Sequence, residues 1–570
     1  MKKTLSLLLA CVMLLSLLAA CTVTPINTTP STPSKTEPSA PSKTEPSTPS
    51  TPSKSEPTKA AEPTAAPKAE KPKKITVEIF DRGNAGGSAP EDNYYTDYIK
   101  RGMLRDYNVE VTFVPVPRWT EVDVLNNLLA AGDAPDVCVT YSWPTIQTYA
   151  NMGGVVDMAP HLEAIKPKLT SLWDLLGDTN IYYNKDPLTG TIWAIEAIRY
   201  VNVRIDTFVR EDWLKKLSIK EPTSLQEFET MLKAFKDNAS TLLGKDASKL
   251  IPFSIGSDVG WRANNLIMSF VPSSMTDKEA FIYGFDSARL VQYPGAKEAI
   301  RKLNEWYHSD LMWKDFALSA SGDTTEDNMM KAGYVGSFMH NWDYPYRDAE
   351  QGIHYNLQTL VSPDAAYIAI DPFKNDAGKY TKLLYSTIDR KVFFPSTNDE
   401  PEASLLYLEW ISKFEHRNFL QIGEEGVTHQ VLADGTVKTI PGRDDKIMNS
   451  GNNLDYTITI NGLDMGDPIK SAQCLALGYS GVDKRFIEKA YVTGMNDGMV
   501  FQNFNVGEIS SENGMGQALD TKRDNLFAQA IVAKPADFDA VWDAGYKDYL
   551  DSGARAIQEE REALLNKFYK

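Results

Sequence analysis

The stretch EVDVLNNLLAAGDAPDVCVTY, residues 121–141, decides the fold. Its first half carries apolar side chains at helical spacing and stops at Gly132, a residue type that often ends a helix. A turn with Asp and Pro follows, and Val137–Tyr141 then has the composition of a buried strand. Working outward, Ile75–Ile79 and Val109–Phe113 alternate apolar and polar residues, which predicts two earlier strands. Strands separated by helices in this order predict a βαβ unit in a parallel sheet.

Ligands of such open sheets bind beyond the carboxyl ends of the strands, which here are residues 81–87 and 141–143. The rest of the chain predicts a mixed α/β protein without a periodic repeat. The further predictions are a capping box at Thr223–Gln226, a helix starting at Pro401, a last helix over residues 537–568 with a break near Gly553, and strands at Tyr334–Met339 and Lys391–Phe394.

The chain begins with the pattern of a secretory leader, residues 1–20. Lys2 and Lys3 precede the apolar run Leu5–Leu18, which is shorter than the ~20 residues of a membrane span. Residues 18–21 (LAAC) resemble the lipobox of bacterial lipoproteins, which implies cleavage before Cys21 and acylation of that cysteine, with palmitate among the acyl chains. The alternative is a cysteine that falls near a signal-peptide cut by chance. Two or three acyl chains hold a protein stably on a membrane, so we expect a tether outside the cytosol.

Residues 21–74 follow as a linker rich in Pro, Ser, Thr, Lys and Glu, in which Pro-Ser-Lys-Thr-Glu-Pro-Ser occurs twice. The linker has almost no apolar side chain to bury, which predicts disorder, and its prolines favour an extended spacer. O-glycosylation also fits this composition, but a passive spacer is the preferred interpretation.

The bulk composition limits the partners of the globular part. The formal net charge of −17 argues against nucleic acid and anionic lipid headgroups. The globular part, residues 75–570, is long enough for two or three domains with large cores. Beyond Cys21, the mature chain holds Cys138 and Cys474. A disulfide between these two is one option, and two separately buried thiols are the favoured one.

Several short segments, taken in order from about residue 75 to the end, resemble bacterial extracellular solute-binding proteins (family 1), the lipoprotein component of ABC sugar importers. They are AGDAPDV (131–137), GGVVDM (153–158), VREDWLKKL (209–217), KAGYVG (331–336), NWD (341–343), PEA (401–403), GEEGV (423–427) and YLDSG (549–553). The resemblance implies a two-lobed α/β, periplasmic-binding-protein-like fold of type II, with hinge strands between the lobes and a ligand cleft. Residues 75–570 would form this domain, with lobe 1 at roughly 75–200, lobe 2 at roughly 205–365, and later segments in both.

Carbohydrates need flat aromatic platforms and paired hydrogen-bonding groups, so the candidate ligand residues are aromatic and polar side chains in loops or at strand ends. They are Arg82, Asn84, Trp143, Glu196, Trp261, Arg262, Trp342, Asp343 and Tyr344. The alternative for each is a structural role in the core. Trp213, Trp306, Trp313 and Trp410 fall on helical patterns and are interpreted as core residues.

The sequence gives little support for a metal site or for an enzyme. Asn184, Asp186 and Thr189 form an oxygen-rich turn that could hold calcium, but its spacing departs from the EF-hand and an ion-free turn is favoured. We predict no metal site and no cofactor. The sequence contains no phosphate loop, H-E-x-x-H zinc motif or G-x-S-x-G elbow. Asp133 and Asp136 could pass for catalytic carboxylates, but such residues more often shape turns.

We therefore expect a monomeric, extracytoplasmic receptor, lipid-anchored to the outer face of a membrane of the Gram-positive type. It would capture a carbohydrate, foremost an oligosaccharide, and deliver it to the transmembrane subunits of an ABC permease without acting as an enzyme. Two alternatives stay open: a secreted polysaccharide-active enzyme, and a sensor that presents its ligand to a membrane kinase.

Overall fold

The computed structural model describes residues 71–83, 88–284, 290–319, 324–347, 351–440, 446, 455–477 and 482–569. The predicted leader, Cys21, most of the linker and Asn84 lie outside these residues. Every described element belongs to one compact unit, Glu70–Lys570. None of the helices in the described ranges has the length and apolar character that a membrane crossing requires.

The predicted βαβ unit opens the fold and is confirmed. Strand β1 (Lys73–Asp81) pairs in parallel with β2 (Val109–Pro117), and α2 (Tyr94–Tyr107) connects them. Helix α3 (Glu121–Ala131) ends at Gly132, whose φ of 76° is left-handed, as expected for a glycine stop. β1 begins at Lys73, so the last residues of the predicted linker already belong to a strand.

Strand β3 (Cys138–Thr140) lies beside β1 on the side away from β2, because Val137 forms a parallel bridge with Val77. The Asp136 carboxylate fixes this contact by accepting hydrogen bonds from the backbone N–H of Thr76 (2.7 Å) and its hydroxyl (2.8 Å). Asp136 therefore has the turn-shaping role that the sequence favoured.

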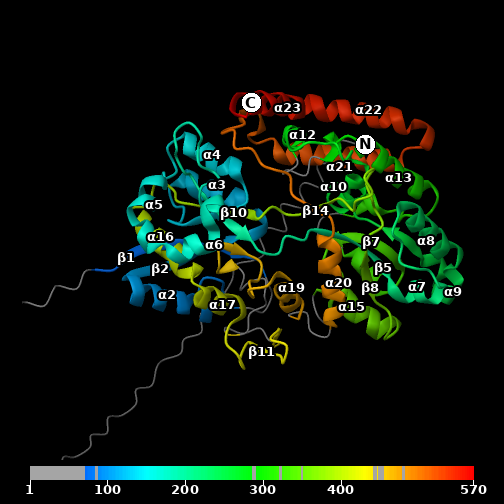
Figure 1. Cartoon of the computed structure of the whole chain (residues 1–570), viewed down its shortest axis with the longest axis horizontal. Coiled ribbons are helices and arrows are strands. Elements are labelled where there is room, and N and C mark those ends of the chain that lie inside the picture. The colour runs from blue at the N-terminus through cyan, green and yellow to red at the C-terminus, as the bar shows by residue number, and fades with distance from the viewer. Residues whose placement is uncertain are drawn as a thin grey trace, which may run out of the picture. The chain divides into compact units, whose positions relative to one another are not determined.

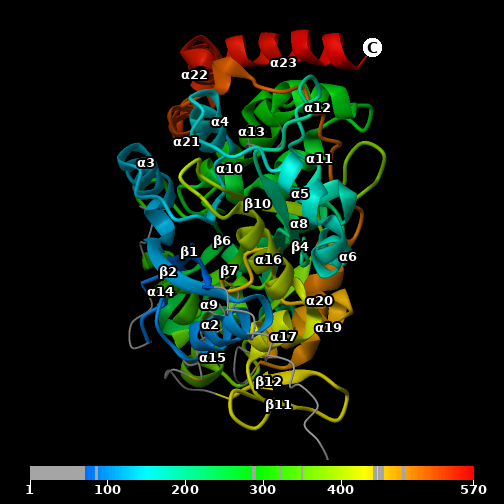
Figure 2. The same ribbon diagram turned by 90° about the vertical axis from the view of Figure 1, so that its left-hand side faces the viewer.

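β3 itself belongs to a four-stranded sheet with three strands from later parts of the chain. Its order is β13–β4–β10–β3, formed by β4 (Ile195–Arg199), β10 (Ile388–Phe393) and β13 (Ile460–Asn461), with β10 antiparallel to both neighbours. α16 (Pro401–Ser412), which starts at the predicted proline, packs on β1, α2 and α6 (Figure 2). The helices around this sheet include α4 (Trp143–Asn151), α5 (Ala159–Ile165), α6 (Thr170–Ile181) and α17 (Phe414–Ile422).

A second sheet has the order β6–β7–β5–β8, with β5 antiparallel to β7 and β8 and with β6 parallel to β7. Its strands are β5 (Ile205–Arg210), β6 (Ile251–Ser254), β7 (Val335–Asn341) and β8 (Tyr367–Ile370). Figure 1 labels β5, β7 and β8, and Figure 2 labels β6. Its helices include α7 (Glu211–Leu217), α8 (Leu225–Asp237), α10 (Val259–Arg262), α11 (Asn264–Phe270), α13 (Ala296–His308), α14 (Thr325–Lys331) and α20 (Lys484–Met495).

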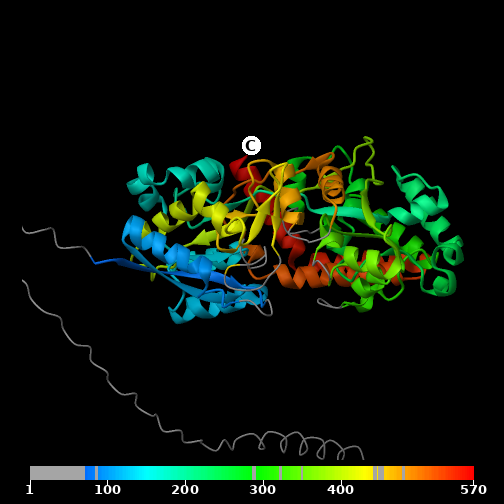
Figure 3. The ribbon, with the colours of Figure 1, turned by 90° about the horizontal axis from the view of Figure 1, so that it is seen from below.

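The C-terminal helices pack with the second sheet. α21 (Gly516–Val532) contacts α13, and α22 (Phe538–Tyr549) contacts α21. Figure 3 shows these helices, coloured orange to red, alongside the green helices of this part. α23 (Arg555–Phe568) follows after Gly553, whose φ of 126° interrupts the helix at the predicted break.

Two large hydrophobic cores underlie the two sheets. The first core contains residues between Ile75 and Ile195 and returns over Val392–Ile458, and the second spans Val201–Ile370 and later segments up to Ile557. The four tryptophans interpreted as core residues are buried: Trp213, Trp306, Trp313 and Trp410. Since both cores lie within Glu70–Lys570, this unit holds the packing it needs to fold by itself.

The structure also tests the predictions for the two cysteines and for the capping box. Cys138 and Cys474 are free, buried thiols, as favoured. The predicted capping box is wrong: the N-cap of α8 is Ser224, whose hydroxyl accepts the N–H of Glu227, and Thr223 and Gln226 do not form a box. The backbone N–H and the hydroxyl of Thr223 instead donate to the Glu227 carboxylate. The side chain that accepts these bonds is thus Glu227 and not the expected Gln226.

Candidate functional site

Two stretches of chain cross between the two sheets and hydrogen-bond to each other. Residues 200–204 lead from β4 to β5, and residues 384–387 lead back to β10 from β9 (Lys382–Leu383). Tyr385 N–H donates to the Asn202 carbonyl (2.9 Å), and Arg199 N–H donates to the Thr387 carbonyl (2.8 Å). Side chains on these crossing segments therefore lie where the two sheets are joined.

Arg204, at the end of the first crossing, is buried yet has no anionic partner among the residues that the structure describes. Its guanidinium lies 4.4 Å from the centre of the Trp261 ring and 5.6 Å from that of Tyr385. These two rings are tilted by 37°, with centroids 5.9 Å apart. Arg204 is 8% exposed, and its buried Nε has no hydrogen-bond partner within the described ranges. Burial lowers the pKa of Arg204, and the nearby positive charges of Arg199 and Arg523 lower this pKa further.

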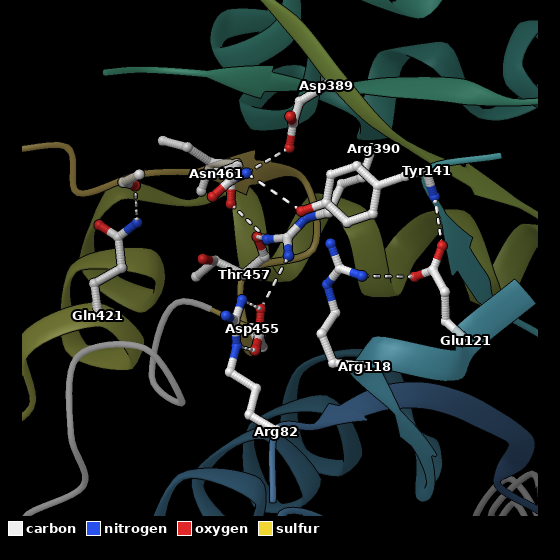
Figure 4. A network of polar contacts seen from close by, with 12 residues as sticks. Arg82, Arg118, Glu121, Tyr141, Asp389, Arg390, Gln421, Asp455, Thr457 and Asn461 are labelled. Atoms are coloured by element: carbon white, nitrogen blue, oxygen red, sulfur yellow. Dashed lines mark hydrogen bonds and ion pairs between the residues drawn. The ribbon is translucent and has the colours of Figure 1, made fainter. Parts of the chain in front are cut away.

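Arg199, at the start of the same crossing, lies with its guanidinium 4.0 Å from the Tyr385 ring centre and forms an ion pair with Asp389. Asn461 donates from its side-chain amide to Asp389 (2.6 Å) and to the Tyr141 hydroxyl (3.4 Å). This chain of contacts links the crossing to Tyr141, which follows β3 at the strand end where the sequence placed a ligand (Figure 4).

A second aromatic and basic group surrounds Tyr141. The Arg118 guanidinium lies 4.2 Å from the Tyr141 ring centre and 5.4 Å from that of Trp119. Arg118 also forms an ion pair with Glu121 (3.7 Å), and Glu121 accepts the Tyr141 N–H (2.9 Å). Trp119 is 73% exposed, so its face is available to a ligand in solution.

Arg82, one of the predicted residues, joins this group. Its guanidinium lies 5.9 Å from the Trp119 ring centre and forms an ion pair with the buried Asp455. Arg390 donates to the same carboxylate (3.2 Å) and to the carbonyls of Thr457 (3.0 Å) and Ile460 (2.8 Å). In Figure 4, Arg82 and Arg390 point toward Asp455 from different elements. Asp455 thus holds Arg82 in place beside the exposed tryptophan.

The predicted residues Trp261 and Trp143 are both half-buried. Trp261 belongs to the Arg204 group, on α10. Trp143 is the first residue of α4 and packs against the first core. Glu196 is fully buried, accepts a hydrogen bond from Asn184 (2.6 Å) and lies 3.6 Å from the Lys391 ammonium. Burial raises the pKa of Glu196. The structure therefore brings Arg82 and Trp261, but not Glu196, to the basic and aromatic groups.

Four other predicted residues have structural partners. Arg262 is buried and binds Glu326 through two hydrogen bonds (2.9 and 3.0 Å). Trp342 is 5% exposed and packs edge-on against Tyr491, which favours a core role. Asp343 accepts a hydrogen bond from Arg347 (2.6 Å). Tyr344 stacks on His340 and donates to Asp327 (2.8 Å). Asn84 lies outside the described residues, so its role, like that of these four, stays a prediction.

In the oxygen-rich turn at Asn184–Thr189, the Asp186 carboxylate accepts hydrogen bonds from backbone N–H groups of the same turn. Asp186 accepts the N–H groups of Leu188 (2.8 Å) and Thr189 (2.7 Å), and these bonds help to lower the pKa of Asp186 against the effect of burial. Within the described ranges, no group of three or more His, Cys, Asp or Glu side chains is placed to hold a metal ion.

Sequence reasoning missed Trp119, Arg118, Arg199, Arg204 and Tyr385. One local signal was present, since Arg118-Trp119 directly follows the proline that ends β2. The others gather only through contacts between distant segments, such as the pair Arg199–Asp389, which lies 190 residues apart. Taken together, the groups offer planar donors beside flat rings, the combination that a carbohydrate ring with hydroxyl groups requires.

Comparison with known proteins agrees with this architecture. Residues 103–413, more than half of the chain, match the sequence profile of the family described as bacterial extracellular solute-binding protein. The chain therefore belongs to this family.

Two proteins of Bacillus subtilis (strain 168) are similar in sequence. Lipoprotein LipO is 25% identical over 235 residues, which cover 40% of this chain and 43% of LipO. The polygalacturonan/rhamnogalacturonan-binding protein YtcQ is 23% identical over 401 residues, or 64% of this chain and 70% of YtcQ. The chain thus matches less than half of the length of LipO.

Among solved structures, the alginate-binding protein AlgQ2 without calcium ion superposes with a TM-score of 0.58 at 18% identity, covering 87% of this chain and 99% of AlgQ2. This likeness is one of fold. It confirms the predicted two-lobed α/β fold of solute-binding proteins, in which the two sheets and their cores form the lobes.

Proposed function

We propose that the protein is a lipid-anchored, extracytoplasmic receptor that captures a carbohydrate and delivers it to an ABC import permease. The observation that carries the proposal is the group of arginines and aromatic rings at the crossing segments. Arg204, Trp261 and Tyr385 lie there, and an unbroken series of contacts runs from Arg199 to Tyr141.

An oligosaccharide is the favoured ligand, because the rings are distributed over two groups. Trp261 and Tyr385 form one pair, and Trp119 stands beside Arg82 and Arg118 in the other. One stacked ring and its hydrogen bonds occupy one such group, so a ligand that uses both needs more than one sugar unit. YtcQ and AlgQ2, which resemble this chain, carry glycan-binding names, and this supports the choice.

We propose binding without catalysis. Members of the family are named for solute binding, and the carboxylates near the rings have structural partners: Asp389 pairs with Arg199, and Asp455 pairs with Arg82 and Arg390. A glycosidase needs two carboxyl groups facing the glycosidic bond, and these two carboxylates are held by arginines instead.

The test uses residues 70–570, purified and screened by thermal shift against a panel of neutral and acidic oligosaccharides. A ligand that binds only the folded state raises Tm, and calorimetry then gives the affinity. Mass spectrometry of the ligand after incubation distinguishes binding from turnover. We expect a rise in Tm with at least one glycan, recovered intact. A cut glycan would favour the enzyme alternative, and a panel without any response would refute a carbohydrate ligand.

A further inference from the structure

Arg204 is a buried cation without a matching anion. Its side chain has no ion pair or hydrogen bond with any described residue, and its guanidinium lies over the rings of Trp261 and Tyr385. Removing a charge from water costs free energy unless an opposite charge or hydrogen bonds replace the lost solvent. A guanidinium over two ring faces recovers only part of that free energy.

The carboxylate next to Arg204 along the strand does not serve as its partner. Asp206 is 1% exposed, and neither of its carboxylate oxygens has a hydrogen-bond partner in the part of the chain that the structure describes. Burial raises the pKa of Asp206 well above the ordinary value, although the charge of Lys382 opposes this shift. Among the described residues, Asp206 forms neither an ion pair nor a hydrogen bond with Arg204, so it is not the partner of this cation.

The arginines near Arg204 differ from it because each has its own acid. Arg199 pairs with Asp389, and Arg347 donates to Asp343. Arg523 pairs with two acids, Asp520 (2.8 Å) and Asp524 (2.9 Å). Each of these arginines thus has at least one acidic partner, whereas Arg204 has none among the described residues.

We propose that Arg204 binds a carboxylate carried by the sugar itself, so that the preferred ligand is an oligosaccharide with a uronic acid unit. The planar guanidinium offers two parallel N–H donors, which match the two oxygens of a carboxylate. Trp261 and Tyr385 lie beside it and provide the face on which the same sugar ring stacks. This inference rests on the proposed carbohydrate function and names the chemical class of its ligand.

The ligand comparison uses matched pairs that differ in one group. The trimers of galacturonate, mannuronate and glucuronate are each measured by calorimetry against their methyl esters, which keep the sugar and remove the charge. We expect one free acid to bind at least tenfold tighter than its ester, a difference of about 1.4 kcal/mol. The affinity of this acid should also fall with added NaCl, because a charge pair is screened by salt.

The protein comparison removes the cation. In residues 70–570, Arg204→Gln should abolish both the preference for the acid and its salt dependence, and Arg204→Lys should keep only part of the preference because an ammonium lacks the planar fork. Arg301→Gln is the charge-matched control, since Arg301 lies on α13 and pairs with Glu298 and Asp539. The control should bind as the parent does.

Protein stability without ligand distinguishes a binding cation from a structural one. Arg204→Gln removes an uncompensated buried charge, so its Tm should be no lower than that of Arg301→Gln. A large fall in Tm for Arg204→Gln alone would overturn the inference, as would esters or a sulfated trisaccharide binding as tightly as the acids. Tight binding of neutral glycans alone would refute the acidic ligand and leave the carbohydrate function intact. A complete lack of glycan binding would refute both.

Discussion

Glu78 on β1 is a single residue that should make folding sensitive to pH. It is 1% exposed and accepts the Val139 N–H (2.8 Å). Burial raises the pKa of Glu78 well above its ordinary value of 4.5, and the charge of Glu121 adds to the rise. Folded Glu78 therefore keeps its proton at a pH where the unfolded chain has lost it, so stability falls as pH rises above about 4.5.

Glu78→Gln keeps the acceptor for Val139 and removes the ionisable group. We expect its Tm to exceed the parent's at neutral pH and the difference to shrink toward about pH 4, measured by calorimetry across this range. Glu227→Gln is the control of opposite sign, because hydrogen bonds from Thr223 lower the pKa of Glu227. Equal pH dependence of Glu78→Gln and the parent would show that Glu78 is ionised when folded.

Substitution of Trp119 should change ligand affinity without changing protein stability. Because its side chain is 73% exposed, Trp119→Ala should leave Tm unchanged. It should weaken glycan binding about tenfold, a loss of about 1.4 kcal/mol, through the lost stacking face. Leu360→Ala, at a side chain that is 71% exposed, serves as the control for both measurements. Unchanged calorimetric affinity in Trp119→Ala would remove Trp119 from the site.

The role of a single residue could be predicted from the sequence where that role depends only on the residue and its neighbours in the chain. Gly132 was predicted as a helix stop because the left-handed backbone it adopts is a property of one residue and its neighbours. Arg204 carried no such signal, since its importance comes from the lack of a partner, and that depends on every segment folded around it. Trp342 shows the converse, because its loop context suggested a ligand platform while its side chain is 5% exposed.

At the scale of elements, the contact between α2 and α16 sets a strict limit on side-chain size. A Cβ atom added at Gly102 on α2 would lie 2.1 Å from Cζ2 of Trp410 on α16. Trp410 is fully buried and its indole N–H donates to Asp106 (2.8 Å), so the ring has little freedom to move.

Gly102→Ala should therefore destabilise the protein by about 1–3 kcal/mol, the usual range for overpacking, measured by urea unfolding. The matched control is Gly516→Ala at the start of α21, where an added Cβ meets no atom within 4 Å. That control should be neutral or slightly stabilising, because alanine favours a helix more than glycine does. Similar stability of the two variants would mean that α2 and α16 can move apart at little cost.

The elements whose order the sequence predicted are those with strong periodicity. β1, β2 and α3 were predicted because the apolar alternation of a strand and the apolar spacing of a helix can both be recognised in a short segment of sequence. The insertion of β10 between β3 and β4 was not predictable in the same way, since it joins strands far apart in the chain. The expectation of hinge strands between the lobes, and of later segments in both lobes, came from the family resemblance and not from periodicity.

At the scale of the whole molecule, anchoring depends on a segment outside the described residues. If Cys21 is acylated, Cys21→Ser expressed in the full chain should appear in the culture medium, whereas the parent should fractionate with membranes. Cys11→Ser, which changes a cysteine within the same leader, is the control and should stay membrane-bound. Detergent phase partitioning followed by immunoblotting measures the distribution. Membrane retention of Cys21→Ser would refute the lipid anchor.

The two buried thiols make this molecule convenient for observing motion directly. Cys138 and Cys474 are free, and burial raises the pKa of both, so neither should react readily with maleimide dyes in the folded state. In residues 70–570 these are the only cysteines. One new surface cysteine on each lobe would therefore accept a fluorophore pair without any background substitutions, and energy transfer between the dyes could follow each capture event in single molecules.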